Sequence, residues 1–173
     1  MPEYLAALRV HGATLYIDIR RQPGSRRHPH FSKDSLEESL REAGIAYEHA
    51  VDLGGHREPR EDSANLGWKE PYLRGYADHA ETELFQMALE RVILLAEQEE
   101  LRGGRLVVAC AEREPLDCHR QVLADALVAA GAAVMHVIDT SPPLPHVPPA
   151  FARFDGTGVH YPAIAPIQGS LFA

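Results

Sequence analysis

The segment Cys110-Ala-Glu-Arg-Glu-Pro-Leu-Asp-Cys-His-Arg120 contains two cysteines, and the second is followed directly by His119 and Arg120. The segment follows an apolar run and precedes a helical pattern, so we expect it to join a strand end to a helix start, the edge at which open α/β sheets bind ligands. Free N–H groups at a helix start lower the pKa of a thiol, here Cys118 beside His119 and Arg120. The pattern predicts a thiolate nucleophile or an anion site, with Glu112 or His119 moving protons.

The other cysteine, Cys110, has more than one interpretation. A thiol that ends an apolar strand is commonly part of the core, but Cys110 is also a candidate substrate contact and a candidate partner for Cys118. Seven residues separate the two cysteines, so the sequence leaves their pairing geometry open. Two cysteines and one adjacent histidine lack the paired spacing of a structural zinc site, so no metal is predicted and the cofactor is left unknown.

A basic cluster follows the first predicted strand, in the segment Asp18-Ile-Arg-Arg-Gln-Pro-Gly-Ser-Arg-Arg27. Guanidinium groups bind phosphate or carboxylate through paired hydrogen bonds, so we expect Arg20 and Arg26 to hold an anion. The alternative for Asp18 is structural, as a salt-bridge partner that fixes Arg20. The remaining arginines of the cluster are interpreted as solvated charges.

A long stretch over residues 52–78 carries glycines and aromatic residues that favour a functional loop. Gly54 and Gly55 permit a close backbone approach to a ligand. Asn65 and Tyr76 offer hydrogen bonds and, for the tyrosine, a stacking face for a base. The aromatic residues of this stretch are equally suited to closing the edge of the core.

Helical and strand patterns alternate along the chain and predict an α/β fold with a mainly parallel sheet flanked by helices. Strands are expected over 15–19, 46–51, 106–110 and 133–138, and helices over 2–10, 35–43, 83–101 and from 117 or 118 to 130. Five prolines within residues 142–149 predict that an extended tail begins at residue 142 and runs over the domain or into solvent. The predicted division is a domain over 1–141 and a tail over 142–173.

Length and composition restrict the class of protein. A chain of 173 residues fits one domain, and its net charge of −8 argues against coating nucleic acid by bulk attraction. No apolar run approaches the length of a membrane span, so no membrane contact is expected. Two cysteines suit a reduced compartment, and the predicted location is the cytoplasm.

Four ordered motifs resemble one family, the domain of unknown function 488 (DUF488). They are Tyr16-Ile-Asp-Ile-Arg20 with Pro23-Gly-Ser-Arg26, Gly44-Ile-Ala-Tyr47 with Leu53-Gly-Gly55, Asn65-Leu-Gly-Trp68 with Tyr76-Ala77, and Cys110-Ala-Glu112 with Cys118-His-Arg120. The resemblance implies one site built from these segments. The substrate contacts expected there are Asp18, Arg20, Ser25, Arg26, Tyr47, Gly54, Gly55, Asn65, Tyr76 and Cys110.

One departure from the family concerns the start of the chain. Similar proteins usually open with a strand and a Thr-Ile-Gly-His-Ser-like turn, whereas this sequence begins inside the first predicted helix. Two explanations stay open at this point: the strand is missing, or the start was assigned too late.

The chain ends in Gln168-Gly-Ser-Leu-Phe172, which resembles the peptide by which bacterial replication and repair proteins bind the sliding clamp. Leu171 and Phe172 would fill an apolar pocket, and Gln168 would fix the register by hydrogen bonds. The alternative is an apolar end that packs back on the domain. A clamp contact would bring the chain to DNA by tethering.

Three hypotheses follow from the sequence. The first is an enzyme acting on an anionic substrate, a nucleotide or nucleic acid, through the Cys-His-Arg site. The second is a non-catalytic module of replication or repair that binds DNA or a nucleotide. The third is a thiol redox sensor that uses both cysteines.

Overall fold

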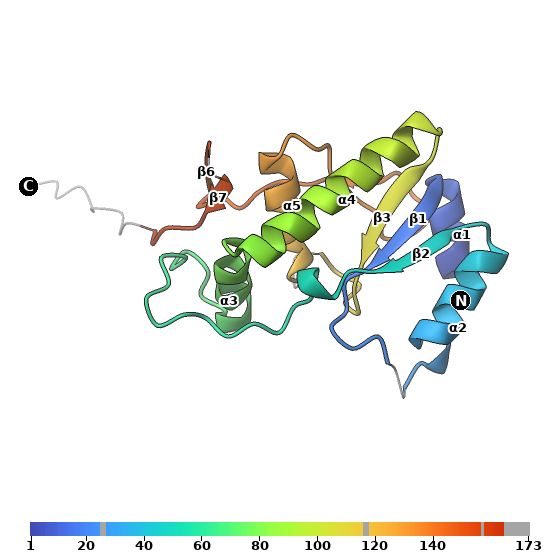
Figure 1. Cartoon of the computed structure of the whole chain (residues 1–173), viewed down its shortest axis with the longest axis horizontal. Helices are drawn as coiled ribbons and strands as arrows, with labels where there is room; N and C mark the ends of the chain where they lie inside the picture. The colour runs from blue at the N-terminus through green and yellow to red at the C-terminus, as the bar shows by residue number, and fades with distance from the viewer. Residues whose placement is uncertain (25–26, 116–117, 157, 165–173) are drawn as a thin grey trace, which may run out of the picture.

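The computed structural model describes residues 1–24, 27–115, 118–156 and 158–164 (Figure 1). Its centre is a three-stranded parallel sheet in the order β2-β1-β3, with β1 (Ala13–Asp18) between β2 (Ala46–His49) and β3 (Arg105–Ala109). Both pairings are parallel. The predicted α/β class with a parallel sheet is therefore confirmed.

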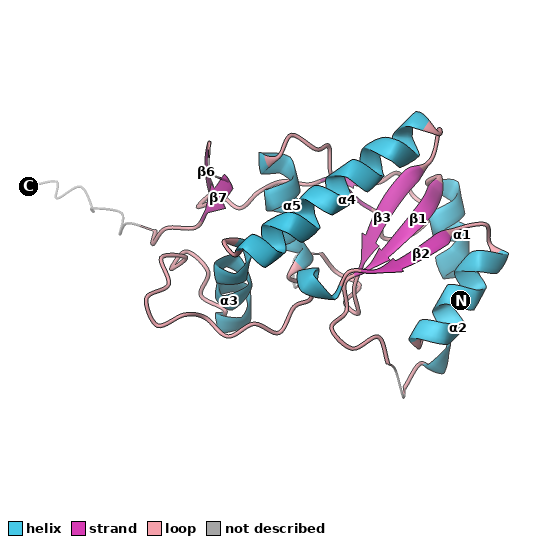
Figure 2. Cartoon of the chain, in the orientation of Figure 1, coloured by secondary structure: helices cyan, strands magenta, loops and turns pink. Residues whose placement is uncertain are grey.

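Helices flank the sheet, as Figure 2 shows. The α-helices within the described residues are α1 (Pro2–Val10), α2 (Lys33–Glu42), α3 (Pro71–Ala80), α4 (Glu83–Leu101) and α5 (Arg120–Ala129). Shorter elements are η1 (Pro29–Phe31), η2 (Val51–Leu53), β4 (Met135–His136), β5 (Leu144–Pro145), β6 (Arg153–Asp155) and β7 (Gly158–His160). No described helix combines the length and the apolar character that crossing a bilayer requires.

The two faces of β1 pack in two different core clusters. Leu15 and Ile17 lie in the larger core cluster, which α3, α4 and α5 complete. Tyr16 lies in the smaller cluster, together with Leu36 and Leu40 of α2. The alternation of Leu15, Tyr16 and Ile17 between the clusters is the period of two expected of a strand. The spacing of four between Leu36 and Leu40 is that of one face of a helix.

Helix α3 corrects the prediction that residues 52–78 are irregular throughout. Gly75 weakened the helical pattern there, because glycine is unfavourable inside a helix. A Cβ at that position would lie 2.2 Å from the carbonyl oxygen of Arg57, so the helix needs a residue without a side chain. The signal that was present is the buried face at spacings of three and four, formed by Leu73, Tyr76, Ala77 and Ala80.

The predicted last strand over 133–138 is also wrong in extent and in partner. Only Met135–His136 is a strand, and it pairs antiparallel with β5 instead of joining the parallel sheet. This pairing joins the chain after α5 to the Pro-rich segment. Because the sheet has only two strands, Pro145 lies in an edge strand, where its missing N–H is tolerated.

The segment after α5 contacts the domain through His146 and Tyr161. Tyr161 is 1% exposed and belongs to the larger core cluster. Its hydroxyl donates to Oδ2 of the fully buried Asp125 at 2.7 Å, and its backbone N–H donates to Oδ1 of Asn65 at 3.1 Å. His146 Nε2 lies 2.7 Å from Oδ1 of the same aspartate. Two residues of the segment therefore share one buried carboxylate of α5.

We predict that Asp125→Ala lowers the free energy of unfolding by about 3–5 kcal/mol, because it leaves two buried donors without their acceptor. Tyr161→Phe is expected to cost only about 1 kcal/mol, since His146 still donates to the carboxylate. Urea denaturation measures both. The exposed Glu97→Gln is the matched control, and equal losses in all three variants would contradict the anchoring role.

Candidate active site at the cysteine pair

The predicted Cys-His-Arg segment lies at one edge of the sheet. β1 and β3 run parallel and end together, where the backbone N–H of Ile19 donates to the carbonyl oxygen of Ala109 at 3.0 Å. Cys110 follows β3 directly. Helix α5 begins at Arg120, with His119 as its N-cap, so Cys118 precedes the helix instead of opening it as predicted.

The two cysteine sulfur atoms are in direct contact. Cys110 Sγ lies 2.9 Å from Cys118 Sγ, and both residues are free cysteines. Cys110 also accepts a hydrogen bond from the backbone N–H of Glu112 at 3.3 Å. Cys118 is 1% exposed, whereas Cys110 is only partly buried. The sequence left open whether the two sulfurs approach each other, and the structure brings them into contact as free cysteines. Cys110 is the more accessible sulfur.

Arg120 supports the buried sulfur from the first turn of α5. Its Nε donates to Cys118 Sγ at 3.3 Å, and its backbone N–H donates to the same sulfur at 3.5 Å. Its Nη2 donates to the carbonyl oxygens of Glu112 and Arg113 at 2.5 Å and 3.1 Å. The guanidinium thus closes the loop over the thiols, and the exposed Glu112 contributes backbone atoms to the cluster.

The electrostatics of the pair favour one proton on two sulfurs. The hydrogen bond from Cys110 lowers the pKa of Cys118 and outweighs burial, which raises it, and His119 and the N–H of Arg120 lower it further. The same hydrogen bond, together with burial, raises the pKa of Cys110. The pair therefore titrates as a unit, with a thiolate on Cys118 and a thiol on Cys110 over a wide pH range.

The His119 imidazole packs in the same cluster. Its Nδ1 lies 3.7 Å from Cys118 Sγ, and the ring of Tyr76 packs against it at 4.8 Å between centroids. A Cβ on Gly55 would lie 2.7 Å from Nδ1, so this glycine makes room for the imidazole. His119 Nε2 is buried and, among the described residues, has no hydrogen-bond partner.

Arg20, which the sequence predicts to bind an anion, is bonded to Asp18 at the end of β1. Arg20 forms a salt bridge of 2.6 Å with the fully buried Asp18, and its Nη1 donates to the carbonyl oxygen of Phe31 at 2.6 Å. Tyr47 donates to Asp18 at 2.9 Å, and burial and this contact with the carboxylate raise the tyrosine pKa. This geometry is the structural alternative for Asp18, and it leaves the Arg20 guanidinium with little freedom to hold a substrate.

The comparisons with known proteins agree with the motifs. The family model described as "Domain of unknown function DUF488" matches residues 1–127. The chain belongs to the DUF488 family. The match runs from α1 into α5 and contains both cysteines. No curated protein and no solved structure matches the chain.

Asn65 and Gly54, two further predicted residues of this DUF488 chain, contact groups other than the thiols. Asn65 Nδ2 donates to Asp78 and Glu81, at 3.0 Å and 2.8 Å, so this side chain joins a structural network. Gly54 lies against Arg21, whose Cγ would be 2.4 Å from an added Cβ. Ser25, Arg26, Gln168, Leu171 and Phe172 lie outside the described residues.

The sequence reasoning missed a chain of polar groups beside the DUF488 site. His136 Nε2 lies 2.9 Å from His146 Nδ1, which continues the contact between His146 and Asp125. Burial and the charges of His146 and Arg120 lower the pKa of His136. The available signal was Asp125 itself, the one acid in the apolar run from Val122 to Ala130.

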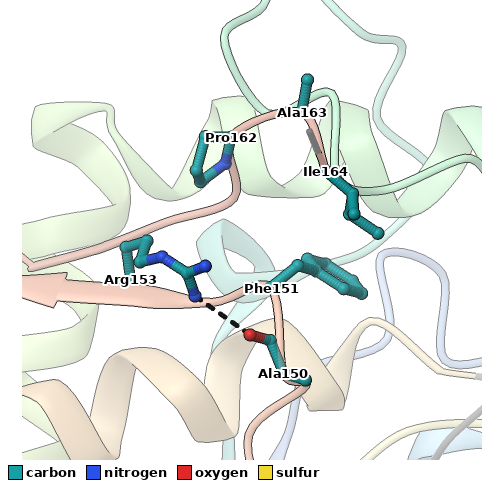
Figure 3. Close-up of a pocket in the computed structure, with 6 residues that line it drawn as sticks. All are labelled: Ala150, Phe151, Arg153, Pro162, Ala163 and Ile164. Atoms are coloured by element: carbon teal, nitrogen blue, oxygen red, sulfur yellow. Dashed lines mark hydrogen bonds between the residues drawn. The ribbon is translucent and has the colours of Figure 1, made fainter. Parts of the chain in front are cut away.

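A separate pocket of about 380 Å³ lies where the C-terminal hairpin ends (Figure 3). Arg153 Nη1 donates to the carbonyl oxygen of Ala150 at 3.0 Å across it. The described lining residues are Ala150, Phe151, Arg153, Pro162, Ala163 and Ile164. None of them belongs to the predicted site of this DUF488 chain, so the pocket does not extend the thiol cluster.

The shared proton predicts a pH-dependent stability. A lowered pKa at Cys118 gives stability that grows as the pH rises toward the ordinary thiol value of about 8.5, by up to about 1.4 kcal/mol per pH unit. A raised pKa at Cys110 gives stability that is lost above that value. The unfolding free energy of reduced wild type, relative to a Cys110→Ser, Cys118→Ser double variant, should therefore peak near pH ~8.5. A difference that stays constant with pH would contradict the shared proton.

Proposed function

We propose that this DUF488 protein carries out dithiol–disulfide redox chemistry, in which Cys110 attacks an electrophilic sulfur and Cys118 resolves the mixed disulfide. The observation that supports this most is the 2.9 Å separation of the two sulfur atoms. Closing it to a disulfide bond of about 2.05 Å needs a displacement of only about 0.9 Å. The reaction thus requires little rearrangement of the strand end or of the helix start.

The division of roles follows from exposure and charge. An external electrophile reaches Cys110 first, because Cys118 is 1% exposed. Cys118, as the thiolate, accepts the proton of Cys110 through their mutual hydrogen bond and so activates the outer sulfur as a nucleophile. Arg120 and the amino end of α5 hold the charge on Cys118 before the reaction begins.

The steps balance for a disulfide substrate, RSSR. Cys110 forms a bond to one substrate sulfur, RS⁻ leaves, and the Cys110 proton moves to Cys118. His119, 3.7 Å away, is the base positioned to take that proton on to the departing RS⁻. Cys118 then attacks Cys110 Sγ and releases the second RS⁻. The protein dithiol is oxidised by two electrons, and the substrate is reduced to one thiol and one thiolate.

The first hypothesis from the sequence is an enzyme that acts on an anionic substrate. For the proposed chemistry, it implies a preference for a negatively charged disulfide. Arg20 is engaged by Asp18, whereas Arg120 donates directly to Cys118 Sγ, so Arg120 is the predicted anion-binding cation that lies beside a reacting sulfur. Comparing oxidised glutathione, which carries carboxylates, with the neutral hydroxyethyl disulfide tests this preference. Faster reaction with the charged disulfide in wild type but not in Arg120→Gln supports it.

We predict that Cys118→Ser accumulates a stable mixed disulfide on Cys110, because the resolving sulfur is gone. Wild type should instead end as the Cys110–Cys118 disulfide and release two equivalents of thiol. Cys110→Ser should react at least ~10-fold more slowly than wild type, since its remaining thiol is buried. Intact-protein mass spectrometry after mixing with the disulfide measures all three outcomes.

Circular dichroism of each variant controls for unfolding. Release of only one thiol equivalent by wild type, with no internal disulfide, would overturn the resolving role of Cys118. Continued release over many cycles in the presence of a reductant would indicate an enzyme, whereas a single stoichiometric oxidation would indicate the redox sensor of the third hypothesis.

The sliding-clamp contact stays a prediction from the sequence, and with it the alternative of a DNA- or nucleotide-binding module. We expect the full chain to bind a bacterial sliding clamp and a chain truncated after residue 166 not to bind. Isothermal calorimetry measures both, and a Leu171→Ala, Phe172→Ala chain is the matched control for the truncation. Equal binding by full and truncated chains would rule out the tail as the contact.

A further inference from the structure

The thiol cluster also has the composition of a metal site. The ligand atoms of Cys110, Cys118 and His119 all lie within 4.8 Å of one another. Two thiolates and an imidazole form a soft donor set, which suits Zn²⁺ better than Mg²⁺ or Ca²⁺. The sequence spacing did not predict a metal, because the set is assembled by the contact of β3 with the start of α5 and not by a local Cys-x-x-Cys motif.

The separation of the sulfurs is intermediate between two known states. Two thiolates on one tetrahedral zinc, each about 2.3 Å from the metal, lie about 3.8 Å apart. Two sulfurs in a disulfide lie about 2.05 Å apart. The observed 2.9 Å is within about 1 Å of both values. Small displacements of Cys110, which lies on a loop, therefore reach either state.

The histidine is positioned as a third ligand. One ring nitrogen, Nδ1, faces Cys118 Sγ at 3.7 Å, and Nε2 has no hydrogen-bond partner among the described residues although it is buried. Gly55 and Tyr76 fix the imidazole from two sides. An imidazole with one buried nitrogen that has no hydrogen-bond partner among the described residues, and whose other nitrogen faces a cysteine sulfur, is available to coordinate a metal.

We propose that the site binds one Zn²⁺ through Cys110 Sγ, Cys118 Sγ and a ring nitrogen of His119, with the fourth position left to water or substrate. The bound metal blocks the dithiol reaction, and oxidation to the disulfide expels the metal. This second statement depends on the proposed function, whereas the binding of the metal does not.

Metal binding changes the protonation of the two cysteines. Zn²⁺ binds cysteines as thiolates, so any proton on the two sulfurs is displaced to solvent when the metal binds, and the metal neutralises the two thiolates. Arg120 then donates to a coordinated sulfur and serves as an outer-shell hydrogen-bond donor. Hydrogen peroxide takes two electrons from the two thiolates, its O–O bond breaks to give two hydroxide ions, and the disulfide that forms no longer binds the ion.

The test is a titration of the reduced, metal-free protein with Co²⁺, which reports thiolate coordination by charge-transfer absorption and tetrahedral geometry by its visible bands. We expect one Co²⁺ per chain, displaced by one Zn²⁺. Cys110→Ser and Cys118→Ser should lose the charge-transfer band in part, and His119→Ala should weaken binding by about 100-fold or more. His56→Asn, at an exposed histidine, is the matched control and should bind as wild type does.

The outcomes separate this inference from the proposed function. No tetrahedral Co²⁺ spectrum, or binding unaffected by His119→Ala, overturns the metal site, and the metal-free disulfide reaction then stands or falls separately. Zinc binding with an unchanged rate of disulfide formation overturns the mutual exclusion alone. Zinc that protects both thiols from the disulfide, and is released when peroxide oxidises them, supports the whole inference.

Discussion

The hydrogen bond between two cysteine sulfurs is the interaction on which the site depends. A thiolate at the nearly buried Cys118 is unfavourable unless fixed donors replace the lost water. Cys110 supplies one donor, and Arg120 supplies two more from its side chain and its backbone. Because these groups come from a strand end and a helix start, the stability of the thiolate requires β3 and α5 to hold their relative positions.

Several features of the fold serve that requirement. Asp18, Arg20 and Tyr47 form a polar cluster at the end of β1, beside β3. On the other side, Asp125 of α5 accepts from Tyr161, so the segment after the family match is bonded to the same helix that carries Arg120. Of the residues that the resemblance implied as substrate contacts, Cys110 thus joins the reactive pair, whereas Asp18, Arg20 and Tyr47 are bonded to one another.

The sequence predicted much of this arrangement, since apolar periodicity and the Cys-His-Arg segment both have local causes. Helices 2–10 and 83–101 were predicted with the bounds that the structure has. The sulfur contact was not predictable from spacing, because it depends on how the loop between β3 and α5 folds back. The salt bridge of Asp18 with Arg20 was one of the alternatives that the sequence offered, but the role of Asn65 was out of reach, because a side chain bonded to a structural partner has the same sequence signature as one that binds a ligand.

The most direct test of the account is to count thiolates in the reduced protein by ultraviolet absorbance during a pH titration, with the Cys110→Ala variant alongside. The account predicts one thiolate per chain at about pH 7, well below the ordinary thiol range, and a thiolate that forms at higher pH once the donor of Cys110 is removed. Two thiols that both ionise only in the ordinary range near pH ~8.5 would contradict the shared proton and, with it, the proposed chemistry.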